Sequence, residues 1–258
     1  MNKQACCAVA VILALCILGT GLFGQDAINL KDTRLLAQPA LSPSHIAFIY
    51  AGDLWIANRN GAEVRRLTSS DGVESNPAFS PDGKWIAFSA QYDGNVDVYV
   101  APIEGGSPRR LTWHPGADTV QGCPPDGTAV LFTSSREVFT DRYTQLFTVA
   151  IAGNSPVEAL RIPNASNGAF SPDGARIVYN PLYKAFTQWK SYRGGTVSTL
   201  SILRLSDSSV EKIPQPDGRC NDTDPMWMGD TVYFRSDRNG EFNIFAYDLK
   251  SKKIRQLT

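Results

Sequence analysis

The chain has few of the residues on which catalysis at neutral pH most often depends. It has two histidines among 258 residues, His45 and His114. No Gly-x-Ser-x-Gly sequence, phosphate-binding glycine loop or Cys/His metal spacing occurs. A Ser-His-Asp catalytic triad needs a histidine as general base, and both histidines are expected in exposed loops. We therefore expect no catalytic residue, no metal site and no cofactor in this chain.

An excess of charge of either sign is also absent. Lys plus Arg number 25, Asp plus Glu number 25, and no long block of one sign appears. Proteins that bind nucleic acid or anionic membranes usually carry a basic patch. The balance therefore predicts no nucleic acid partner, and contact with a membrane only through the N-terminal segment.

The N-terminal segment contains a single apolar run, and that run is short. Lys3 precedes apolar residues 8–18, and small residues follow before Gln25. The pattern is typical of a secretory signal peptide, so residues 1–25 are predicted to be a signal peptide and the protein to be exported, periplasmic or otherwise extracytoplasmic. The alternatives are an uncleaved membrane anchor, a lipoprotein site at Cys16, and a cytoplasmic protein.

The most prominent feature of the sequence is an internal repeat. Residues 79–88, 123–132 and 170–179 share a Pro-Asp-Gly turn that is followed by alternating apolar positions. In such a turn Pro sets φ, Asp bonds the backbone two residues on, and Gly accepts a positive φ. A unit that recurs every ~40 to 50 residues around a tight turn is typical of a β-propeller blade.

The repeats predict an all-β fold, a β-propeller with five recognisable four-stranded blades. One blade cannot cover both of its faces, so neighbouring blades must pack around an axis. Five blades predict an incomplete six-bladed propeller, with closure of five blades as the alternative, and uncovered end faces predict poor solubility. The propeller domain is predicted at 26–258, with blades at about 35–68, 76–112, 120–160, 168–213 and 224–258.

Cysteines are few once the predicted signal peptide is removed, because only Cys123 and Cys220 remain. They lie two blades apart, too far to meet in a radial array. We expect unpaired core thiols.

The repeat brings acidic residues into register. When the blades are aligned on their turns, Glu74, Asp118 and Asp222 fall at equivalent positions just before the inner strand, with Ala165 in the fourth blade. Such a ring is predicted to rim the central channel and bind cationic groups, such as peptide amino termini, or a cation. The alternative is that acidic residues gather in loops between blades because they tolerate turns and solvent.

An insertion at 180–195 in the fourth blade is a second candidate surface. Trp189, Tyr192 and Arg193 are of the types that anchor interfaces, and loops on a rigid scaffold often carry recognition. The alternative is that they only cover the edge of the blade. The pairs Arg65-Arg66 and Arg109-Arg110 on outer strands are expected to be solvated.

Three segments of the fourth and fifth blades carry a family resemblance. Residues 189–196 (Trp-Lys-Ser-Tyr-Arg-Gly-Gly-Thr), 221–227 (Asn-Asp-Thr-Asp-Pro-Met-Trp) and 233–240 (Tyr-Phe-Arg-Ser-Asp-Arg-Asn-Gly) resemble the tricorn protease family. The turn repeats are also similar to TolB-like propellers and to those of prolyl oligopeptidase relatives. The resemblance implies a six-bladed N-terminal propeller, then a seven-bladed one, a PDZ-like domain and a serine peptidase core. The catalytic residues of that core have no counterpart here.

Two functions follow as hypotheses. In the first, the chain is the N-terminal propeller of a tricorn-like serine peptidase and admits or filters oligopeptides for a downstream catalytic core that this chain does not contain. Its partners would be peptides, unfolded polypeptide or that catalytic part. In the alternative, it is a stand-alone exported TolB-like propeller that binds proteins or peptides and performs no chemistry.

Overall fold

Repeated antiparallel sheets make up the computed structural model, which describes residues 36–139, 143–182 and 191–258. The described strands form five four-stranded sheets, and within each sheet consecutive strands pair. The predicted all-β propeller of five four-stranded blades is therefore confirmed. No described segment forms a helix long and apolar enough to cross a bilayer.

Each blade is built from four strands in chain order. The first two blades contain β1 Ala37–Leu41, β2 His45–Tyr50, β3 Asp53–Asn58 and β4 Arg65–Arg66, then β5 Glu74–Phe79, β6 Trp85–Ala90, β7 Asp97–Pro102 and β8 Arg109–Arg110. The third and fourth contain β9 Asp118–Gly122, β10 Ala129–Ser134, β11 Gln145–Ala150 and β12 Glu158–Ala159, then β13 Asn167–Phe170, β14 Arg176–Asn180, β15 Ser201–Arg204 and β16 Val210–Lys212. The fifth contains β17 Asp222–Met228, β18 Thr231–Ser236, β19 Asn243–Asp248 and β20 Ile254–Gln256.

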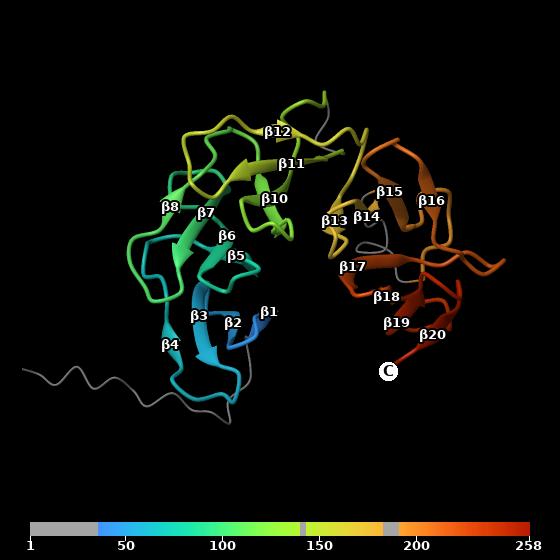
Figure 1. Cartoon of the computed structure of the whole chain (residues 1–258), viewed down its shortest axis with the longest axis horizontal. Helices are drawn as coiled ribbons and strands as arrows, with labels where there is room; N and C mark the ends of the chain where they lie inside the picture. The colour runs from blue at the N-terminus through green and yellow to red at the C-terminus, as the bar shows by residue number, and fades with distance from the viewer. Residues whose placement is uncertain (1–35, 140–142, 183–190) are drawn as a thin grey trace, which may run out of the picture. The chain divides into compact units, whose positions relative to one another are not determined.

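The blades follow one another around an arc, with the first strand of each nearest the middle (Figure 1). The inner strands β1, β5, β9, β13 and β17 contact their neighbours in that order. The outer strands β4, β8, β12, β16 and β20 lie at the periphery. This order places residues from all five blades around one central space.

Four hydrophobic clusters fill the junctions between consecutive blades. Ile56 of the first blade packs with Phe88 of the second, and the same kind of cluster joins the second to the third, the third to the fourth and the fourth to the fifth. Each fully buried Phe, Leu or Ile contributes about 1.5–3 kcal/mol. Among the described residues no such cluster joins the fifth blade to the first.

The hairpin turns repeat their geometry closely. Gly83, Gly127 and Gly174 have φ of 68°, 69° and 69°, the left-handed region that glycine adopts without steric cost. In the second and fourth blades Ser80 and Ser171 donate to Asp82 and Asp173, and these hydrogen bonds lower the pKa of both carboxyls.

We expect Gly174→Ala to lower the free energy of unfolding by about 1–2 kcal/mol. The turn holds this position at a positive φ, which is sterically unfavourable for an L-residue with a Cβ. The added Cβ would also lie 3.3 Å from Cγ of Pro125. Gly218→Ala is the control, since its Cβ meets nothing within 4 Å and no positive φ is involved. Urea unfolding of both variants measures the difference, and equal losses would contradict this account.

Three of the four outer-strand arginines, Arg65, Arg66 and Arg109, are exposed as expected, but two of them also make specific contacts with the following blade. Arg65 and Arg109 each donate to a carbonyl of the following blade, Ile103 O and Ile151 O. The guanidinium carbon of Arg109 also lies 5.7 Å from the centre of the Trp85 ring. These side chains therefore connect the rims of neighbouring blades.

The two cysteines in the described part of the chain are both free, which confirms the predicted unpaired thiols. Cys220 is buried and Cys123 partly buried. Burial raises the pKa of each thiol to about 12. Thiols of this kind are inert at neutral pH.

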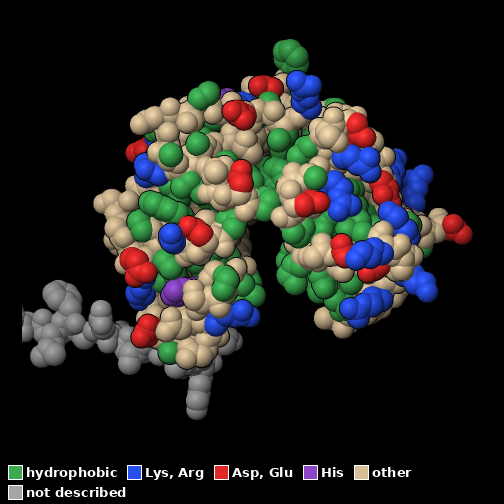
Figure 2. All heavy atoms as spheres, in the orientation of Figure 1, with side chains coloured by type: hydrophobic (Ala, Val, Ile, Leu, Met, Phe, Trp, Pro, Cys, Tyr) green, Lys and Arg blue, Asp and Glu red, His purple; other side chains and the backbone are tan. Residues whose placement is uncertain are grey.

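Apolar side chains remain exposed on the outward faces of the first and fifth blades. Leu41 is 65% exposed, Met226 53%, Met228 64% and Leu257 40%. Figure 2 shows the molecule hollowed between these two blades, with hydrophobic side chains along the walls of the hollow. No described strand covers either face.

We expect these faces to make the 258-residue chain self-associate. The double variant Met228→Lys, Leu257→Lys should move the mass seen by size exclusion with light scattering toward that of a monomer. Val210→Lys changes an apolar residue on the outer strand β16 whose exposure, 52%, lies between those of Met228 and Leu257, and should leave association unchanged. A monomeric wild-type chain would refute the expectation.

Candidate functional site

The three aligned acidic residues lie inside the blade junctions. Glu74, Asp118 and Asp222 begin β5, β9 and β17, and their exposures are 1%, 0% and 0%. Their carboxylates do not belong to the wall of the central cavity described below. A buried carboxylate must be paired or hydrogen-bonded, so the partners define the role of each.

Asp118 and Asp222 form the same arrangement in two blades. Arg136 reaches Asp118 at 2.6 Å and Arg238 reaches Asp222 at 2.9 Å. Each guanidinium also lies over a stacked aromatic pair. The rings are Phe132 and Phe147, each 5.2 Å from Arg136, and Phe234 and Phe245, each 5.1 Å from Arg238.

Serine fixes each of these arginines. Ser134 Oγ accepts from Arg136 N and Nε at 3.2 and 3.1 Å, and Ser236 Oγ does the same for Arg238 at the same distances. The sequences are Phe-Thr-Ser-Ser-Arg at 132–136 and Phe-Arg-Ser-Asp-Arg at 234–238. This Phe-x-Ser-x-Arg repeat marks the two arginines in the sequence, but it does not contain the carboxylates that they reach.

Glu74 uses a different set of partners at the equivalent position. Its carboxylate accepts from Leu54 N at 2.5 Å and from Thr68 Oγ1, both in the preceding blade. It also accepts from the hydroxyl of Tyr92, and burial together with this carboxylate raises the pKa of Tyr92. Glu74 therefore joins the first blade to the second. A part for these three acidic residues in peptide binding stays a prediction.

Replacing Arg238 should destabilise the fold, because the buried carboxylate of Asp222 would lose the guanidinium that balances its charge. We expect Arg238→Ala to lower the free energy of unfolding by about 3 kcal/mol or more. Arg204→Ala breaks an ion pair at 3.3 Å whose side chains are 59% and 50% exposed, and should change stability by less than about 0.5 kcal/mol. Chemical denaturation compares them, and similar effects would count against the buried pair.

The insertion of the fourth blade is anchored to the fifth. Arg193 Nη1 lies 2.6 Å from Asp237 Oδ2, and Asn221 Nδ2 donates to Tyr192 O at 2.9 Å. The Tyr192 hydroxyl lies 2.9 Å from Thr196 Oγ1. Trp189 lies outside the described residues. Arg193 therefore binds within the molecule, and a role of this loop in recognition stays a prediction.

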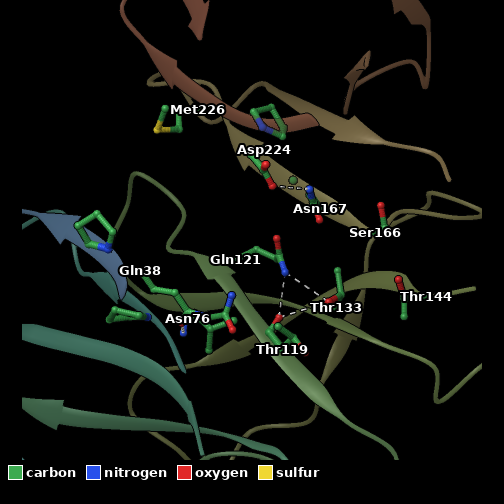
Figure 3. Close-up of a pocket in the computed structure, with 15 residues that line it drawn as sticks. Gln38, Asn76, Thr119, Gln121, Thr133, Thr144, Ser166, Asn167, Asp224 and Met226 are labelled. Atoms are coloured by element: carbon green, nitrogen blue, oxygen red, sulfur yellow. Dashed lines mark hydrogen bonds between the residues drawn. The ribbon is translucent and has the colours of Figure 1, made fainter. Parts of the chain in front are cut away.

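A cavity of about 530 Å³ lies where the five inner strands converge (Figure 3). Every blade contributes at least one polar residue to its wall, and we single out one from each. We call these five the amide collar: Gln38, Asn76, Gln121, Asn167 and Asp224. Hydroxyl groups of Thr119, Thr133, Thr144 and Ser166 complete the polar lining.

Irregularities in the inner strands give three collar residues their backbone conformation. Gln38, Asn76 and Asp224 have φ of 49°, 52° and 53°, and the register of each strand shifts at that point. Each precedes a proline, which has no N–H to give to a ladder. A left-handed non-glycine residue costs of order 1–3 kcal/mol, and such strain gathers at functional sites.

Several contacts of the collar side chains are long, although Gln38 Oε1 accepts from Asn76 N at 2.5 Å. Asn167 Nδ2 lies 3.4 Å from Asp224 Oδ1, and Gln121 Nε2 lies 3.4 Å from both Thr119 O and Thr133 Oγ1. These exceed the usual 2.9–3.0 Å, so a ligand could replace them at small cost. The charge of Asp224 is balanced by Arg235 at 2.8 Å.

A second cavity of about 380 Å³ shares four wall residues with the first, and most of the residues that line it are of apolar types. Gln121 and Met226 border both. Leu41, Phe79, Phe170 and Trp227 line the second. Amide and hydroxyl side chains thus line the first cavity, and large apolar residues are among those that line the second. The collar escaped the sequence analysis, although a polar residue before Pro at 38–39, 76–77 and 224–225 would have indicated it.

The histidines form no catalytic arrangement in the described part of the chain. The expected exposed loop is wrong for His45, which is the first residue of β2 and is half-buried. Its Nδ1 lies 2.8 Å from Oγ of the neighbouring Ser44. His114 Nδ1 accepts from Gly116 N at 3.0 Å. No three His, Cys, Asp or Glu side chains among the described residues gather as a metal would require.

Comparison with known proteins agrees with this architecture. Residues 33–258 match the model of the tricorn protease N-terminal β-propeller domain. The chain is 30% identical over 230 residues to a tricorn protease homolog from Saccharolobus solfataricus, and this covers 85% of the chain and 20% of the relative. A crystal structure of the tricorn protease superposes with a TM-score of 0.75 at 28% identity, over 87% of this chain and 22% of that one.

A TolB propeller from Acinetobacter baumannii shares the fold, with a TM-score of 0.67 at 21% identity over 86% of this chain and 54% of that one. The chain spans about a fifth of the length of the tricorn relatives that it matches. The family match and the five blades lead to one conclusion: the chain belongs to the tricorn protease family, as its N-terminal β-propeller domain.

Proposed function

We propose that this propeller binds oligopeptides in its central cavity and admits them to the catalytic part of a tricorn-like serine peptidase, which lies outside this chain. The central cavity carries the proposal. It is lined by all five blades, and its wall combines hydrogen-bonding side chains with prolines and a methionine. A rigid scaffold around such a wall suits selection of extended chains over folded ones.

The chain would contribute binding and selection, and no bond cleavage. Neither described histidine is held by a carboxylate in the manner of a general base, which is consistent with chemistry supplied elsewhere in the family. Export to the periplasm is part of the proposal and rests on the pattern of residues 1–25, which lie outside the described residues.

Isothermal titration of the purified chain with unstructured peptides of increasing length tests this function. We expect saturable binding, weakened about tenfold or more by Met226→Trp, because overpacking a filled site costs about 1–3 kcal/mol. Met228→Trp makes the same change two residues further along β17, outside the cavity wall, and should leave the affinity unchanged.

Equal effects of the two tryptophan variants, or no binding to wild type, would refute the cavity as the peptide site. The chain alone should hydrolyse none of these peptides, and turnover abolished by His114→Ala would contradict that part. Tight binding of a folded partner that neither variant affects would favour the alternative of a TolB-like scaffold, which the shared fold permits.

A further inference from the structure

The chemistry of the central cavity is defined by what its wall contains. Among the described residues that line it, Asp224 is the one ionisable side chain, and there is no Lys, Arg or aromatic ring. Arg235 balances Asp224. A phosphate ligand would need cationic partners, and a hard cation would need several carboxylate oxygens. The wall fits neither.

Carboxamides have the same donor and acceptor groups as the peptide bond. Each offers two N–H donors and an oxygen that accepts two hydrogen bonds. Four of the five collar residues are carboxamides, one each from β1, β5, β9 and β13. They surround the space from different sides. They can therefore donate hydrogen bonds to the carbonyl groups of an extended main chain and accept hydrogen bonds from its N–H groups.

The collar is already held toward this space by neighbouring blades. Gln38 Oε1 accepts from Asn76 N across the first junction, and Asn167 Nδ2 approaches Asp224 across the last described one. Figure 3 shows Gln38 and Asn76 on one side of the cavity and Asn167 and Asp224 on the other, with Gln121 between them. Prearranged groups lose less conformational entropy when a ligand binds.

The large apolar residues in the wall of the second cavity supply a second element of recognition. Phe79 and Phe170 are partly buried, and they line it together with Trp227, which is 8% exposed. Met226 borders both cavities, and methionine adapts its shape to varied side chains. A large apolar side chain placed here would lie beside a main chain held at the collar.

We infer that the ligand is an extended, uncharged stretch of polypeptide, held through its main chain by the amide collar, with one large apolar side chain in the adjoining cavity. This deepens the proposed function and rests on it. Selection would then follow main-chain accessibility and one apolar residue, and it would not follow the charge of the peptide termini. Gln121, which borders both cavities, is the residue that positions the main chain at their boundary.

The probe is acetyl-Ser-Ala-Leu-Ala-Ser-amide, titrated into the full chain. Replacing the peptide N–H after Leu by an ester oxygen should weaken binding about five- to tenfold, the effect of one hydrogen bond. Exchanging Leu for Ser should weaken it about tenfold. The same peptide with free termini should bind within about twofold of the capped form, because the collar carries no unbalanced charge.

Gln121→Leu should reduce the affinity about five- to tenfold and abolish the difference between amide and ester. Gln91→Leu is the matched control: its Nε2 donates to Gly94 O in an exposed loop, and it should bind both probes as wild type does. Gln121→Asn keeps a shortened carboxamide and should restore part of the difference. Thermal melting of each variant shows whether the fold is kept.

The outcomes separate the two proposals. If the probe binds and Met226→Trp weakens it, but the ester and Gln121→Leu change nothing, the amide collar is wrong and the peptide site stands. A lysine-rich peptide that binds more than tenfold tighter than the capped probe would also overturn the inference, because it would show a charge-selective site. If wild type binds no peptide at all, both proposals fail.

Discussion

Coverage of both faces of every sheet is the constraint on which this structure depends. Val178 of the fourth blade packs with the fifth, whereas its neighbour Ile177 packs with the third. A sheet that is apolar on both sides must lie between two others, so the blades succeed one another around an axis. The inner strands meet in the middle as a consequence, and the cavity exists because five of them converge there.

Buried polar contacts then set how one blade joins the next. Glu74 reaches back to Leu54 N and Thr68, and Asn180 donates to Thr199 O and to Asp222 O of the fifth blade, each at 2.8 Å. Hydrophobic contact alone would allow neighbouring sheets to slide, but satisfied polar groups favour one arrangement. These polar contacts constrain the junctions between blades more closely than apolar burial alone requires. The collar side chains are kept in place as a result.

The collar shows how an architectural irregularity becomes a chemical surface. Ladder pairing directs successive side chains to the two faces of a sheet, where neighbouring blades cover them. At Gln38, Asn76 and Asp224 the positive φ and the following proline interrupt the ladder, and these residues line the central space. A polar wall thus arises on a strand whose neighbouring residues remain part of the core.

The sequence by itself determined the repeat, because Pro-Asp-Gly turns and alternating apolar residues act over a few neighbouring positions, and the free thiols followed from blade spacing. It also aligned Glu74, Asp118 and Asp222 correctly. Only the tertiary structure decided where those carboxylates point, since their partners Arg136 and Arg238 lie 18 and 16 residues away in sequence. A polar residue before proline marks three of the collar residues in the sequence, but only the meeting of five blades in space brings all five residues around one cavity.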